Sequence, residues 1–77
     1  MPRLPRITSR KLLRVLVRVG FYINHQTGSH VNLRHGTKTH LHVVVPSHAG
    51  DIAPKTLKSI LAQAEIDLGD FVAMLGK

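Results

Sequence analysis

The stretch FYINHQTGSHVNLRH, residues 21–35, decides the fold of this chain. Each half of the stretch alternates apolar and polar side chains, as half-buried β-strands do. The link between the halves is short and contains Gly28, a residue suited to tight turns. The stretch therefore predicts a β-hairpin with strands at residues 21–26 and 30–35.

Strand alternation assigns each histidine of this hairpin to a face of the sheet. Val31 and Leu33 are the apolar residues of the second strand and are needed by the core. Their neighbour His30 must then lie on the opposite, polar face. The same alternation predicts that His25 and His35 lie on the core side, as edge or packing histidines.

A third strand is predicted at residues 39–45 and ends at Pro46, because proline cannot donate to a central ladder. The three strands form an antiparallel meander with one apolar and one polar face. His40 and His42 lie two residues apart on this strand, so the alternation places both on the same face as His30.

Helical periodicity predicts a helix before and a helix after the meander. Thr8 and Ser9 are candidate N-caps of the first, which ends at Gly20. Pro54 suits the first position of the second, and one or two further turns precede Gly76. The predicted apolar positions are Leu12, Leu13, Leu16, Val17, Leu57, Ile60, Leu61 and Ala64. The order α-β-β-β-α predicts a two-layer α+β domain with both helices on the apolar face of the sheet.

The length of 77 residues predicts one domain, residues 1–77, with a thin core. The absence of cysteine excludes disulfides and thiolate metal sites, which fits a cytoplasmic protein. The sequence shows neither a secretory signal pattern nor an apolar run that could span a membrane. We therefore expect a cytoplasmic protein without a membrane partner.

Positive charge is the strongest feature of the composition. The chain has 11 Lys and Arg against 4 Asp and Glu, and residues 1–50 contain no acidic residue. Such a bias predicts a polyanionic partner, with nucleic acid the first candidate. Solubilising charge, an anionic membrane and an acidic protein are the alternatives.

Four segments, in order along most of the chain, resemble the HicA toxins of bacterial and archaeal toxin–antitoxin systems. They are Gly20-Phe21-Tyr22 after the basic helix, Gln26-Thr27-Gly28-Ser29-His30, Val43-Val44-Val45-Pro46 with His48, and Thr56-Leu57-Lys58-Ser59-Ile60-Leu61. Two positions depart from the family pattern, because Lys55 and Glu65 stand where the family usually has glycine.

The resemblance implies a fold like that of a double-stranded-RNA-binding domain. It also implies the toxin of a type II system: an endoribonuclease that cleaves mRNA, inhibits translation and growth, and is neutralised by a HicB antitoxin. The family's catalytic histidine matches His30.

The chemistry of RNA cleavage is compatible with a single histidine and no metal or cofactor. RNA carries its own nucleophile, the 2′-hydroxyl, and an imidazole can act as base or acid near neutral pH. Cations stabilise the charge that develops on the phosphate. Arg34, on the same strand and face as His30, is the predicted phosphate contact.

The remaining RNA-binding candidates are cations of the first helix and of the start of the second. Free amides at a helix start attract phosphate, and double-stranded-RNA-binding folds use these two helices to follow a duplex. The predicted RNA-binding residues are Arg10, Lys11, Arg14, Arg18, Ser29, Arg34, Lys55 and Lys58.

Three alternatives stay open at this point. His40 and His42 could bind a transition metal, although zinc sites usually have three or four protein ligands, or one of them could assist at the phosphate. His48 could be a loop hydrogen-bonding residue or a residue of the site. The domain as a whole could bind double-stranded RNA without cleaving it, or dock an acidic protein.

Overall fold

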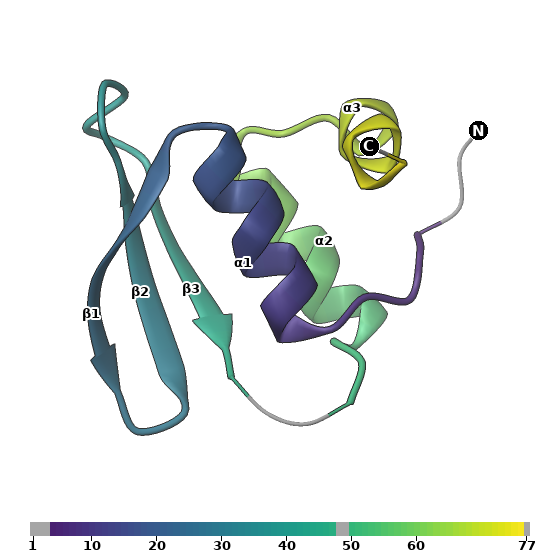
Figure 1. The fold of residues 1–77 in the computed structure, drawn as a ribbon, viewed down its shortest axis with the longest axis horizontal. Coiled ribbons are helices and arrows are strands. Elements are labelled where there is room, and N and C mark those ends of the chain that lie inside the picture. The colour runs from purple at the N-terminus through teal and green to yellow at the C-terminus, as the bar shows by residue number, and fades with distance from the viewer. Residues whose placement is uncertain (1–3, 48–49, 77) are drawn as a thin grey trace.

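The computed structural model describes residues 4–47 and 50–76 and has the expected α+β architecture (Figure 1). Its elements are α1 (Ser9–Arg18), β1 (Phe21–Thr27), β2 (His30–His35), β3 (His42–Pro46), α2 (Pro54–Ala64) and α3 (Leu68–Leu75). The three strands form one antiparallel sheet in the order β1-β2-β3. Within the described residues, no helix is long and apolar enough to cross a membrane.

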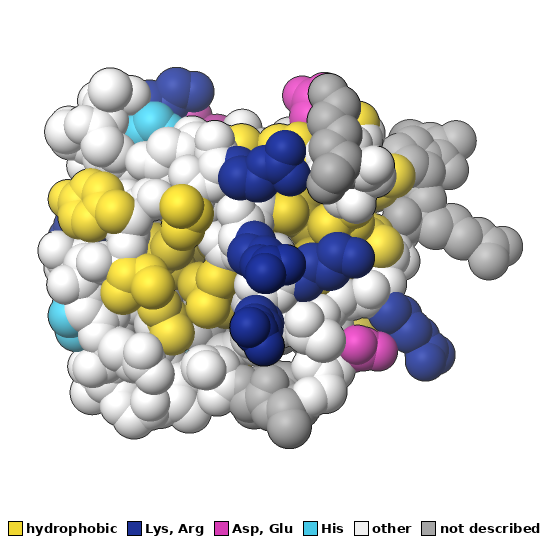
Figure 2. All heavy atoms as spheres, viewed as in Figure 1, with side chains coloured by type: hydrophobic (Ala, Val, Ile, Leu, Met, Phe, Trp, Pro, Cys, Tyr) yellow, Lys and Arg dark blue, Asp and Glu magenta, His cyan; other side chains and the backbone are white. Residues whose placement is uncertain are grey.

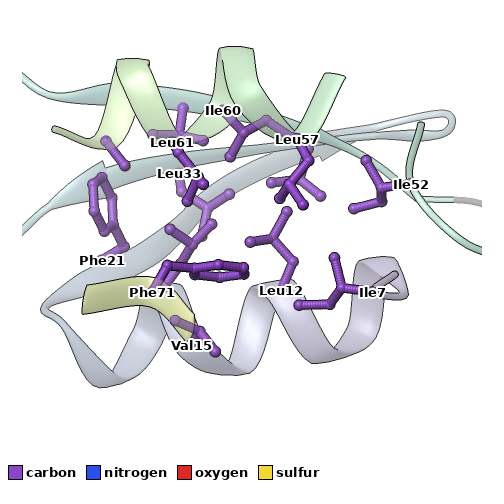
Figure 3. Close-up of a cluster of buried hydrophobic side chains, with 14 of the residues drawn as sticks. Ile7, Leu12, Val15, Phe21, Leu33, Ile52, Leu57, Ile60, Leu61 and Phe71 are labelled. Atoms are coloured by element: carbon purple, nitrogen blue, oxygen red, sulfur yellow. The ribbon is translucent and has the colours of Figure 1, made fainter. Parts of the chain in front are cut away.

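The helices lie on one side of the sheet, as the amphipathic patterns predicted (Figure 1). The sheet contributes alternate residues such as Leu33 and Val43 to the core, and α2 contributes its predicted apolar positions, all of which are buried. Figure 3 shows Leu12 of α1, Leu57 of α2 and Phe71 of α3 in this cluster. The other side of the sheet is left open.

Helix α1 confirms the predicted cap but changes the predicted core positions. The Thr8 hydroxyl accepts a hydrogen bond from the Lys11 amide at 3.2 Å, which satisfies one of the free amides of the first turn. Val15 is buried, whereas Val17 is 53% exposed. The prediction that Val17 faces the core was therefore wrong, because the helix presents the 12, 15 and 16 positions to the sheet.

Strand β3 begins at His42, three residues later than predicted. Residues 39–40 form a turn, and the Leu41 amide donates to the Lys38 carbonyl at 3.0 Å. Leu41 is nevertheless buried. Its apolar side chain extended the alternating pattern and so predicted a longer strand, although Leu41 precedes the strand and follows the turn. His40 consequently lies outside the strand.

A β-bulge in β1 reverses the predicted alternation. Ile23 pairs with Leu33, and His25 pairs with Asn32, the next residue of β2. β1 therefore has one extra residue between these two pairs. Directly opposed residues of an antiparallel pair lie on the same face. His25 therefore lies on the open face with Asn32, and its predicted core-side position was wrong.

The end of α1 is held by His35, which lies on the core side as predicted and is half-buried. Its Nδ1 accepts hydrogen bonds from the Thr37 and Lys38 amides at 3.1 and 3.0 Å, so the proton is on Nε2, which donates to the Val19 carbonyl at 2.8 Å. The ring also packs edge-on against Phe21, with centroids 5.0 Å apart. Gly20, with φ of +107°, lets the chain turn directly beneath this ring.

Helix α2 ends at Glu65, which adopts a left-handed conformation with φ of 56°. Glycine is preferred there, because a Cβ atom costs about 1–2 kcal/mol in this region. Glycine also adds conformational entropy to the unfolded chain, which offsets part of this gain. We therefore expect Glu65→Gly to raise the free energy of unfolding by about 0.5–1 kcal/mol. Urea denaturation followed by circular dichroism measures this change.

Glu65→Gln is the matched control for this prediction. It removes the contact of Glu65 Oε2 with His40 Nε2 at 3.3 Å but keeps the left-handed backbone. Both side chains are more than half exposed, so we expect little change in stability. An equal gain in the Gln and Gly variants would contradict the backbone explanation.

Candidate functional site on the open face of the sheet

His30 is the first residue of β2 and follows the two-residue loop Gly28-Ser29. Gly28 has φ of +55°, a value that favours glycine and suits the first position of a hairpin loop. Val31 is buried and His30 is exposed, so the imidazole lies on the open face, as strand alternation predicted. Within the described residues the His30 ring forms no hydrogen bond to another side chain.

Polar side chains line the open face along β2. Asn32 and Arg34 follow His30 at alternate positions, and Arg34 pairs with Tyr22 on β1 and with His42 on β3. His42 Nε2 lies 3.2 Å from Asn32 Oδ1, which joins the two strands across this face. The open face thus carries imidazole, amide and guanidinium groups, and its histidines and Arg34 are exposed to solvent.

Hydrogen bonds bring three segments together at the His30 end of the sheet. His30 pairs with Pro46, whose carbonyl accepts a hydrogen bond from the buried Ser9 hydroxyl at 2.6 Å. The Ser47 amide donates to the Ser29 carbonyl. The start of α1, the end of β3 and the hairpin loop are therefore fixed relative to one another and to the imidazole.

The other predicted histidines divide between structural and surface positions. His42 lies on the open face as predicted, but His40 lies in a turn beside Glu65, so the two do not form the pair that their spacing suggested. Within residues 4–47 and 50–76, no group of three or more His, Asp and Glu side chains could hold a metal ion. His48 lies outside the described residues.

The predicted RNA-binding cations fall into separate groups. Figure 2 shows a row of Lys and Arg side chains over α1, the helix that carries Arg10, Lys11, Arg14 and Arg18. Arg34 is on the opposite side of the sheet from α1. Lys55 and Lys58 are exposed on the first turns of α2, whose N-cap Ala53 has no side-chain cap.

Sequence analysis missed a hydrophobic surface next to the α1 cations. Val17, Tyr22 and Ile23 are 53%, 50% and 52% exposed and are the exposed large hydrophobic residues of the described chain. Val17 also lines a groove along α1 with residues of α3 such as Leu75. Helical spacing assigned Val17 to the core, and strand alternation placed Ile23 on the same face as Phe21, so neither residue was predicted to be exposed.

These features define a small two-layer domain with an exposed histidine and several cationic surfaces. A family model described as "HicA toxin of bacterial toxin-antitoxin" matches residues 9–66, from the first residue of α1 to beyond the end of α2. The chain therefore belongs to the HicA toxin family. No curated protein matches the chain.

Proposed function

We propose that this toxin is a metal-independent endoribonuclease of a type II system, which cleaves mRNA in the cytoplasm and thereby inhibits translation and growth. The observation that carries the proposal is the position of His30: an exposed imidazole on the open face of the sheet, at a hairpin loop fixed to two other segments. Membership of the HicA toxin family supports the toxin role.

The proposed reaction uses the substrate's own nucleophile. The 2′-oxygen attacks the adjacent phosphorus while its proton passes to a base, and the bond to the 5′-oxygen breaks as that oxygen gains a proton. A cyclic 2′,3′-phosphate and a 5′-hydroxyl result. His30 can accept the 2′ proton as imidazole or donate to the 5′-oxygen as imidazolium.

Arg34 supports the RNA beyond the scissile phosphate in this proposal. It lies four residues from His30 along β2, which at the rise of a strand separates the two Cα atoms by roughly 13 Å. That separation favours contact with a neighbouring phosphate over the phosphate that reacts. Ser29, next to His30 in the loop, is the nearer candidate for the reacting phosphate.

The start of α2 is the second proposed RNA contact. Its uncapped amides, together with Lys55 and Lys58, combine a helix dipole with two cations. Arg10 and the other α1 cations add electrostatic attraction for RNA. A HicB antitoxin is the proposed neutralising partner.

Cleavage is expected to be unaffected by metal removal. We expect the purified chain to cut a 5′-labelled mRNA at the same rate with and without EDTA, because the 2′-hydroxyl, the imidazole and the cations complete the reaction. Denaturing electrophoresis measures the rate. A 2′-O-methyl version of the RNA should bind equally but remain uncut, since its nucleophile is blocked.

The second candidate function is a double-stranded-RNA-binding module without catalysis. It is favoured by the His30 ring, which forms no side-chain hydrogen bond that would orient it as a base within the described residues. This function predicts a shifted but intact RNA in the same assay. Loss of cleavage in EDTA would contradict both the metal-independent mechanism and the binding module.

A further inference from the structure

We propose that the outer edge of β1 docks an acidic segment of the antitoxin as an additional β-strand, with apolar side chains on the surface formed by Val17, Tyr22 and Ile23. We call this surface the β1 patch. The proposal concerns the partner of the toxin and rests on the proposed function only in taking that partner to be its antitoxin.

The β1 patch is unusual because its apolar side chains come from two elements and are about half exposed. Val17 belongs to α1, and Tyr22 and Ile23 belong to β1, which contacts α1. Figure 2 shows hydrophobic side chains gathered over this region, directly beside the row of cations on α1. Exposed apolar side chains beside a charged surface are typical of protein-binding sites.

The backbone of β1 is the second feature that suits this surface for docking a strand. β1 is an edge strand, and within the described residues its only strand neighbour is β2. Its sequence, Phe21–Thr27, contains no Lys, Pro, Asp or Glu, the residues that commonly block edge pairing. An added strand would gain main-chain hydrogen bonds from this edge and specificity from the side chains of the patch.

The faces of β1 fit such a strand. Tyr22 pairs with Arg34 and lies on the open face, whereas Ile23 pairs with Leu33 and lies on the helix side. Alternate side chains of an added strand would therefore find an apolar contact on each face of the sheet. The bulge after Ile23 limits regular pairing to a short length, which disfavours open-ended aggregation.

The positive charge beside the β1 patch indicates which kind of partner binds there. The cations of α1 include Arg10 and Arg14, both exposed, and residues 1–50 contain no acid. A second copy of this chain, with a formal net charge of +7, would bring two cationic rows together. RNA would neutralise the cations but leave the apolar side chains unmatched. A protein segment with both carboxylates and apolar side chains matches both features.

Docking at β1 would also place the antitoxin next to the open face that carries His30. Thr27 of β1 pairs with His30, so a strand added to β1 extends the sheet from which the imidazole projects. The β1 patch itself contains neither His30 nor any of the proposed RNA-binding residues, although it adjoins the cations of α1. Binding of antitoxin and cleavage of RNA can therefore be changed independently.

The test uses the proposed HicB-type antitoxin, produced together with this toxin and separated from it for titration by calorimetry. We expect Ile23→Lys and Tyr22→Ala each to raise the Kd for the antitoxin at least tenfold, with RNA cleavage by the free toxin within twofold of wild type. Ala62→Lys, which adds the same charge on the exposed side of α2, is the control and should change neither quantity. Hydrogen exchange of the β1 amides should slow in the complex.

Unchanged affinity in both β1 variants, unchanged exchange of the β1 amides, or no complex with wild-type toxin would overturn the proposal. Equal weakening of RNA binding and antitoxin binding by Ile23→Lys would also overturn it, since the patch would then be an RNA surface. A toxin that binds the antitoxin through β1 but cuts no RNA would refute the proposed nuclease function and leave the docking site intact.

Discussion

Replacement of His30 by alanine is expected to lower the rate of RNA cleavage by about 10²–10⁴-fold, the usual contribution of a positioned acid–base group. The imidazole is the proposed proton acceptor for the 2′-hydroxyl, and alanine can neither accept nor donate that proton. His30 is exposed, so its removal creates no cavity and the fold should persist. Single-turnover cleavage of a labelled mRNA, and growth of cells after induction, measure the effect.

The matched controls are the other two histidines of the open face. His25→Ala and His42→Ala remove an imidazole from the same face, at positions opposite Asn32 and Arg34 and not at the first residue of β2. We expect both variants to retain cleavage within about tenfold and to arrest growth. Wild-type cleavage by His30→Ala, or an equal loss in all three variants, would show that His30 has no special role.

Gly20→Ala is expected to cause the largest loss of stability among single substitutions on the surface. With φ of +107°, the new side chain is strained, which costs of order 1–3 kcal/mol. Its Cβ would also lie 2.6 Å from Nε2 of His35, the ring that holds the end of α1. Displacing that ring loses hydrogen bonds to Val19, Thr37 and Lys38, for about a further 1–3 kcal/mol.

Chemical denaturation of a small set of variants separates these two causes. In the His35→Ala background the clash is absent, so Gly20→Ala should cost only its backbone strain, and the two substitutions should be non-additive. Gly36→Ala is the control, because its Cβ would meet the Gly20 carbonyl at 3.6 Å, an ordinary contact. Strict additivity of Gly20→Ala and His35→Ala would contradict the proposed clash.

The hairpin shows what sequence alternation can and cannot predict. Val31 and Leu33 determine the face of His30 reliably, because a one-residue shift of β2 would expose both apolar residues. Residues 21–26 alternate just as regularly, yet the bulge after Ile23 reverses the face of His25. A bulge depends on how two strands pair and twist, which a local pattern does not contain.

The helices and the candidate site also contain both features that the sequence pattern predicted and features that it did not. The apolar positions of α2 are all buried as predicted, because only one face of that helix is apolar. In α1 the apolar residues extend around the helix, so the pattern did not distinguish Val15 from Val17. The charge bias predicted a polyanionic partner but could not predict that a hydrophobic surface adjoins the cations, since that requires α1 and β1 to be adjacent in space.

The core of this toxin is completed only by the last part of the chain to be synthesised. His30 leaves the ribosome early, but the apolar face of its sheet is covered by residues made much later, including Leu57 and the fully buried Phe71. A nascent chain that ends before α3 lacks part of its core and holds the imidazole on an unstable sheet. A chain that stops before α3 would therefore present His30 on a sheet whose apolar face is only partly covered.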